Sequence, residues 1–128
     1  MNVLSEVSDK SGSERNEKLT SRSAPTTQRS PEKVDQEYKF SRLLGEGAYA
    51  VVRLAYKRNE GKSYAAKIYD KSKLVDEHRR NSVCREVMLM QKLNHEYIVH
   101  FVEAFETDEH VYVIMEHVEG KSLHDYLR

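Results

Sequence analysis

The sequence predicts an α+β fold: a five-stranded antiparallel sheet with one flanking helix, preceded by a disordered tail. All eight tyrosines and three phenylalanines lie within residues 38–128, so the first 37 residues contain no aromatic side chain. Beyond residue 38, short segments rich in Val, Ile and aromatic residues alternate with polar turns, which is typical of strands. One longer segment has its apolar residues at helical spacing.

The predicted tail covers residues 1–37 and contains both prolines, seven serines and three threonines. Such a segment cannot bury enough apolar surface to offset its conformational entropy. Two of its serines are candidate phosphorylation sites, since Ser23 follows Arg22 and Ser30 precedes Pro31. An inert solvated leader explains the same composition, because short Ser/Pro patterns arise easily in biased sequence.

The five strands are predicted from their content of apolar, β-branched and aromatic residues. They cover residues 40–44, 50–56, 63–69, 98–105 and 110–116. Polar turns at 58–62 and 106–109 separate neighbouring strands, and Gly61 stands where a positive φ is favourable.

The flanking helix is predicted over residues 76–93. Its apolar stripe consists of Val83, Val87, Met90 and Leu93. The helix also carries Cys84, the single cysteine of the chain, so no intrachain disulfide can form. A small buried helix residue is the favoured interpretation of Cys84, with a redox handle as the alternative. The cysteine content indicates a reducing compartment, and we expect a cytoplasmic protein.

The charge balance argues against two classes of partner. Lys and Arg number 21, as do Asp and Glu, so no net field favours nucleic acid or an anionic membrane. The longest apolar run in the second half, residues 111–115, is far too short to cross a bilayer. The first residues lack the basic-then-apolar pattern of a secretory signal. We therefore expect no nucleic-acid partner and no membrane partner.

The turn between the first two predicted strands carries the first chemical signal. It has the pattern Gly45-x-Gly47-x-x-Ala50-x-Val52. Glycines let backbone N–H groups approach phosphate oxygens without an intervening Cβ. A dinucleotide-binding fold places such glycines between a strand and a helix, whereas here both neighbours are strands. Taken alone, the glycines also fit an ordinary hairpin turn.

Two other glycines mimic a different phosphate-binding motif. Gly61 and Gly120 are each followed by Lys-Ser, as at the end of a Walker A sequence. The glycine required five residues earlier is Tyr56 in one case and Met115 in the other, so neither site qualifies.

The third predicted strand makes the pattern specific. Its residues 64–67, Tyr-Ala-Ala-Lys, resemble the Val-Ala-Ile-Lys motif of protein kinases, and a strand–glycine loop–strand hairpin is the arrangement of that family. The resemblance implies that Lys67 holds the α- and β-phosphates of ATP. It also implies that Glu86, 19 residues later on the predicted helix, pairs with this lysine. From the residues alone, either side chain could instead face solvent.

Competing carboxylates for Lys67 fit less well, since Glu96, Glu103 and Glu106 are predicted outside the helix. Residues 95–99, His-Glu-Tyr-Ile-Val, resemble the family's His-Pro-Asn-Ile-Val, with Glu-Tyr in place of Pro-Asn. The resemblance covers about residues 38–128, and its main other departure is Ala50 at the third glycine position.

Residues 111–120 resemble the fifth strand and hinge of the family. The resemblance implies that Met115 guards the back of the adenine pocket and that Glu116 and Val118 bond the adenine edge through their backbones. The whole set of predicted ATP-binding residues is Leu44, Gly45, Glu46, Gly47, Ala48, Tyr49, Ala50, Val52, Ala65, Lys67, Met115, Glu116 and Val118. Within this set, Val52 and Ala65 would enclose the adenine ring. Met90 and Phe101 occupy positions of the family's inner hydrophobic spine, for which plain core packing is an equal or better description.

Several motifs that phosphoryl transfer requires are not found in the sequence. It has no His-Arg-Asp, no asparagine five residues beyond it and no Asp-Phe-Gly, so it offers no catalytic base and no magnesium ligands. Asp125 is interpreted as a cap or surface residue, because residues 122–125 resemble a capping box that would begin a second helix. A helix that begins so late suggests that the sequence stops within a longer domain.

We therefore expect the ATP-binding portion of a serine/threonine protein kinase, inactive alone. Mg²⁺ and a protein substrate are expected only where the missing lobe is present. A natural stand-alone lobe acting as a non-catalytic interaction module is the alternative, and an unrelated small α+β protein is a third hypothesis. An isolated lobe would expose apolar surface, so we expect marginal stability or self-association.

Overall fold

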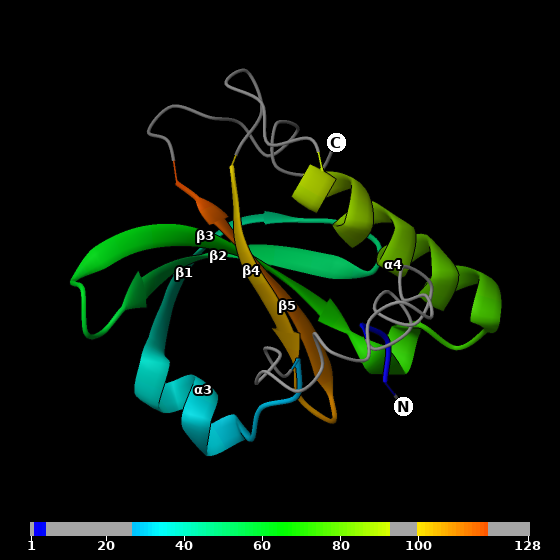
Figure 1. Ribbon diagram of the computed structural model, residues 1–128, viewed down its shortest axis with the longest axis horizontal. Coiled ribbons are helices and arrows are strands. Elements are labelled where there is room, and N and C mark those ends of the chain that lie inside the picture. Colours follow the sequence, from blue (N-terminus) through cyan, green and yellow to red (C-terminus); the bar gives the residue numbers. More distant parts are fainter. Residues whose placement is uncertain (1, 5–26, 93–99, 118–128) are drawn as a thin grey trace, which may run out of the picture.

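The computed structural model describes residues 2–4, 27–92 and 100–117 (Figure 1). Its main body is one five-stranded antiparallel sheet with strand order β1-β2-β3-β5-β4. The elements in chain order are α3 (Pro31–Glu37), β1 (Tyr38–Glu46), β2 (Ala50–Lys57), β3 (Lys62–Asp70), the 3₁₀ turn η2 (Lys71–Lys73), α4 (Glu77–Lys92), β4 (Phe101–Glu106) and β5 (His110–Glu116). The predicted fold class is confirmed. Within the described ranges, no helix is long and apolar enough to cross a membrane.

The strands follow the predicted order with small differences at their ends. β5 has the predicted bounds, whereas β1 extends beyond its predicted range by two residues at each end, β3 by one residue at each end and β2 by one residue at its C-terminal end. The β1–β2 register shifts between Phe40 and Leu43 and again between Leu43 and Gly45, immediately before the glycine loop. Gly61 in the β2–β3 turn has φ +67°, which confirms the expected positive φ. The first predicted residues of β4 lie outside the described residues.

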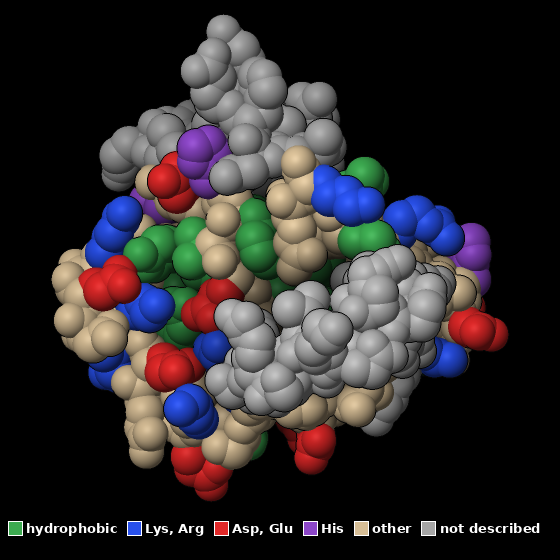
Figure 2. Space-filling view, viewed as in Figure 1, with side chains coloured by type: hydrophobic (Ala, Val, Ile, Leu, Met, Phe, Trp, Pro, Cys, Tyr) green, Lys and Arg blue, Asp and Glu red, His purple; other side chains and the backbone are tan. Residues whose placement is uncertain are grey.

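The sheet has two buried faces, because side chains alternate along each strand. One face packs against α4 and contributes Val52, Ala65 and Val113 to a core that includes Val83 and Val87 of the helix. The opposite face packs against α3 (Figure 1). Its apolar residues are Val34, Tyr38, Ala55, Tyr64, Ala66, Phe105 and Ile114. Charged side chains of both signs are interspersed around the apolar ones on the face shown in Figure 2.

Regular structure begins before the predicted boundary at residue 37. Ser30 caps α3, since its hydroxyl oxygen accepts a hydrogen bond from the Lys33 amide at 3.2 Å, and Pro31 occupies the first turn, which is a favourable position. Val34 is 2% exposed and packs on the sheet, so tertiary contact stabilises a helix too short to persist alone. Residues 5–26 of the predicted tail and the predicted helix start at Ser122 lie outside the described residues.

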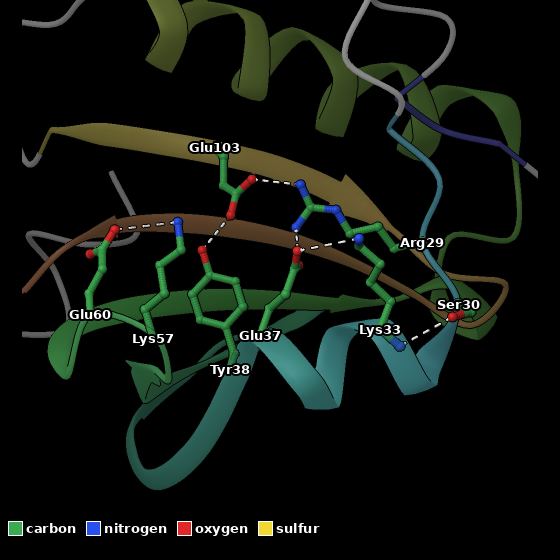
Figure 3. Close-up of polar contacts among 8 residues, drawn as sticks. All are labelled: Arg29, Ser30, Lys33, Glu37, Tyr38, Lys57, Glu60 and Glu103. Atoms are coloured by element: carbon green, nitrogen blue, oxygen red, sulfur yellow. Dashed lines mark hydrogen bonds and ion pairs between the residues drawn. The ribbon is translucent and has the colours of Figure 1, made fainter.

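An ion cluster around Arg29 attaches α3 to the far edge of the sheet (Figure 3). The guanidinium lies 2.8 Å from a carboxylate oxygen of Glu37 and 2.7 Å from one of Glu103, and its Cζ is 4.1 Å from the ring centroid of Phe105. The Tyr38 hydroxyl donates to the other oxygen of Glu103. Burial alone would raise the pKa of Glu103, but the hydrogen bonds from Arg29 and Tyr38 outweigh burial and hold that pKa below its ordinary value.

Candidate nucleotide-binding site

A cleft of about 530 Å³ lies between the β1–β2 loop, β3 and the first half of α4. Its walls are formed by Gly47, Ala48, Tyr49, Ala50, Lys67, Tyr69, His78, Arg79, Ser82, Val83 and Glu86. Six of the residues predicted to bind ATP or to form the supporting ion pair are therefore brought together here: four from the glycine loop, the β3 lysine and the helix glutamate. The basic side chains lining the cleft suit an anionic ligand.

The lysine and the helix glutamate form an ion pair at the floor of the cleft. Lys67 Nζ donates to Glu86 Oε2 at 3.1 Å, and the lysine side chain is 6% exposed against 31% for the glutamate. The strand presents Lys67 toward α4 because it shares a sheet face with Ala65 and Tyr69, two residues to either side. Glu86 immediately precedes Val87, and the burial of Val87 in the core holds this part of α4 against the sheet.

Tyr69 is a third member of this cluster. Its hydroxyl donates to Glu86 Oε1, and Lys67 Nζ lies 5.0 Å from its ring centroid. Burial, together with the charge of Glu86 and the hydrogen bond to it, raises the pKa of Tyr69 well above its ordinary value. The phenol therefore stays neutral and serves as a donor that fixes one glutamate oxygen while Lys67 fixes the other.

The glycine loop is a tight turn closed by its own backbone. The Gly47 amide donates to the Ala50 carbonyl at 2.8 Å, and the Asp70 amide of β3 donates to the Tyr49 carbonyl at 3.2 Å. The Tyr49 ring lies 5.0 Å below the guanidinium of Arg79, which connects the loop tip to α4. Gly47, Ala48 and Tyr49 are exposed, so their free surface faces the cleft and solvent.

The residues assigned to adenine lie beside the cleft but are closed off from it. Val52, Ala65 and Met115 have no exposed surface and belong to one core cluster, in which Ala65 pairs with Met115 across β3 and β5. The half-buried Leu44, Met90 and Phe101 pack against the same cluster. The Glu116 amide donates to the His100 carbonyl at 3.0 Å. Val118 lies outside the described residues.

Four residues of the cleft were not singled out from the sequence: Tyr69, His78, Arg79 and Ser82. Helical spacing from Glu86 identifies two of them, because Ser82 and Arg79 lie four and seven residues earlier on the same face. Tyr69 could have been found from strand alternation, two residues beyond Lys67. No group of three or more His, Cys, Asp or Glu side chains in the described part of the chain is placed to hold a metal ion.

Comparison with known proteins identifies the family of the chain. The protein kinase domain family matches residues 38–128. The chain is 39% identical to serine/threonine-protein kinase cds1 of Schizosaccharomyces pombe over 73% of its own length and 21% of that protein. It is 38% identical to human serine/threonine-protein kinase DCLK3 over 72% of this chain and 14% of that protein, and 36% identical to myosin light chain kinase A of Dictyostelium discoideum over 72% and 31%.

The chain belongs to the protein kinase domain family. The matched residues include the glycine loop, Lys67 and Glu86 of this chain, which spans less than a third of the length of each of these three relatives.

Proposed function

We propose that this chain supplies the ATP-binding part of a serine/threonine protein kinase. The observation that carries the proposal is the partly buried ion pair between Lys67 and Glu86 in a cleft that the glycine loop lines. Several relatives are named serine/threonine-protein kinases, which supports the substrate class of the whole enzyme.

The residues present fit a nucleotide polyphosphate. Lys67 is a fixed cation on a rigid strand, with an ammonium group that Glu86 and the Tyr69 ring hold in one position. Backbone N–H groups of the exposed loop supply further donors, and Arg79 adds positive charge at the mouth of the cleft. Such preorganised groups bind anionic oxygens without reorganising.

The adenine ring is proposed to contact Val52, Ala65 and Met115, with the backbones of Glu116 and Val118 at its edge. Because the three apolar side chains are fully buried here, the ring has to separate packed surfaces as it enters. We therefore expect nucleotide binding to change local packing between β2, β3 and β5.

The complete enzyme would transfer the γ-phosphate of ATP to protein hydroxyls with Mg²⁺, in the cytoplasm. The catalytic-loop and Asp-Phe-Gly motifs are not found in this sequence, so we expect no turnover from the chain alone. Phosphotransfer to a generic serine/threonine peptide above the level of a Lys67→Met control would refute that expectation.

The test of ATP binding is a titration with a fluorescent ATP analogue. Lys67→Met removes the cation while keeping an unbranched apolar side chain, and should weaken binding about tenfold or more, because charge-assisted bonds to phosphate are lost. Lys39→Met, at an exposed position of β1, is the matched control and should bind as the unchanged chain does. Equal binding by both variants would refute the assignment of Lys67.

A further inference from the structure

Residues 2–4 lie beside α4 (Figure 1), far in sequence from the elements that hold them, and the core residues packed around them form a recess that we call the groove. Val3 is 0% exposed and Leu4 is 2% exposed, and both belong to the core cluster shared by α4 and the sheet. Composition places these residues in a leader, yet their side chains are as buried as those of the central strands.

The groove has a polar anchor made by Glu106, the last residue of β4. The Val3 amide donates to Glu106 Oε1 at 2.9 Å, and the Leu4 amide donates to Oε2 at 2.8 Å. The carboxylate is fully buried, and Lys71 Nζ lies 2.7 Å from Oε1. A buried carboxylate requires opposite charge and donors, and here Lys71 and two consecutive peptide amides supply them.

The helix completes the recognition of the segment. The Cys84 thiol of α4 donates to the Val3 carbonyl, so the backbone of the segment is bound on both its N–H and its C=O groups. Val83 and Val87 of α4 belong to the same apolar cluster as Val3 and Leu4. These contacts fit an extended peptide with two adjacent apolar side chains.

We propose that the groove between α4 and the end of β4 is a docking site for a short extended apolar segment. Residues 2–4 of the same chain occupy it, and their binding holds α4 where Glu86 reaches Lys67. Cys84 is bound to the segment, and Glu86 follows it by two positions on the same helix. The coupling to nucleotide rests on the proposed function, whereas the docking itself does not.

The occupant is assigned to the same chain because a second stretch of the leader is fixed at the same residue. The Glu106 amide donates to the Thr27 carbonyl at 2.7 Å, and the Arg29 amide donates to the Glu106 carbonyl at 2.9 Å. The two stretches are 22 residues apart in the sequence, a length that easily allows both to reach one residue. Attachment at both ends raises the effective concentration of the segment at its groove.

The docking is tested through Cys84, the only cysteine of the chain, with a thiol-specific maleimide. A Val3→Asp/Leu4→Asp double variant should label at least about tenfold faster, because a locally opened segment exposes the buried thiol. Val75→Asp is the matched control, since Val75 is 66% exposed, and it should label at the original rate. A blocked peptide of sequence Asn-Val-Leu-Ser, added in excess to the double variant, should slow labelling again. An unchanged rate in the double variant, or no protection by the peptide, would overturn the docking site.

Two further measurements separate the remaining possibilities. If labelling of the unchanged chain slows as its concentration rises, another copy supplies the segment and the intramolecular assignment is overturned.

The double variant should bind the fluorescent ATP analogue at least about fivefold more weakly than the unchanged chain, and the peptide should restore its affinity. Faster labelling with unaltered analogue affinity would overturn the coupling alone. Failure of the unchanged chain to bind the analogue would overturn the proposed function and the coupling together, while the labelling result would still decide the docking site.

Discussion

The role of Tyr69 gives the sharpest prediction about the site. Tyr69→Phe removes one hydroxyl that donates to Glu86 Oε1 and leaves the ring, which lies 5.0 Å from Lys67 Nζ, in place. Tyr69 is 4% exposed, so the substitution changes little volume in a packed core. The Lys67–Glu86 contact remains, but the carboxylate loses one of its two fixed partners.

The expected cost follows from the kind of bond and its exposure. A hydrogen bond to a charged group contributes about 1.5–3 kcal/mol when no other partner replaces the donor. The Glu86 side chain is 31% exposed, so water can replace the lost hydroxyl in part. We therefore expect a loss of about 1 kcal/mol, which is a shift of about 0.7 M in the urea midpoint for an m-value of about 1.5 kcal/mol/M.

The assay is urea unfolding of the purified chain at pH 7 and at pH 10.5. Because the folded state raises the pKa of Tyr69 above its ordinary value of 10.0, the stabilisation by its neutral hydroxyl is present below that pH and is lost as the pH rises above it. The difference between the unchanged chain and Tyr69→Phe should therefore shrink at pH 10.5. Tyr56→Phe, at a 37% exposed position, controls for the loss of a tyrosine.

Equal midpoints for Tyr69→Phe and the unchanged chain at pH 7, with parallel pH dependence, would refute the reasoning. Such a result would mean that Lys67 alone fixes Glu86 and that the buried hydroxyl contributes nothing measurable to the position of α4.

Three further predictions concern the rest of the sheet. Arg29→Met should lower the stability of the fold near neutral pH and should also weaken the loss of stability in acid. The reason is that the depressed pKa of Glu103 contributes stability above the ordinary pKa near 4.5, and this stability is lost as the pH falls through the folded pKa. Thermal melting from pH 7 to pH 3 checks both effects, and a variant that loses as much stability in acid as the unchanged chain would contradict the cause assigned to it. Phe105→Ala should lower the free energy of unfolding, measured in urea, by about 3–5 kcal/mol. The control Leu89→Ala, at a 51% exposed position, should lower it by less than about 0.5 kcal/mol, and equal losses would exclude Phe105 from the core. Gly61→Ala should lower the free energy of unfolding by about 1–2 kcal/mol, because φ is +67° at this position. Steric contact contributes nothing to this loss, since nothing lies within 4 Å of an added Cβ. An unchanged free energy of unfolding would mean that the turn relaxes to a negative φ.

The sheet and α4 could be predicted because their signals are local. The apolar and aromatic residues on either side of Ala65 and Lys67 mark a strand, and the spacing of Val83 and Val87 marks a helix face, before any tertiary contact is known. The position of Glu86 on that helix could be predicted for the same reason, since a helix fixes which side chains share a face.

The leader and Glu106 could not be predicted in this way. Glu106 stands in a polar stretch that the sequence predicts as a turn, yet it is fully buried, because Lys71 and the amides of residues 3 and 4 meet it from distant parts of the chain. Val3 and Leu4 lack any periodic neighbours, so nothing local distinguishes them from a solvated leader. Their burial depends on a groove that exists only once α4 has packed on the sheet.

The contacts of the leader have a common physical effect on β4, which is one of the two edge strands of the sheet. An unpaired edge offers free N–H and C=O groups to other chains, and folded proteins cover such edges. Here Gln28 forms a parallel bridge with Glu106, so the leader pairs with the end of that edge. The side chains of β4 then fasten the leader on both faces: Glu103 holds Arg29 on the side of α3, and Glu106 holds residues 3 and 4 on the side of α4. The same strand therefore connects protection of the sheet edge to the placement of the helix that carries Glu86, and removal of the leader should affect both together.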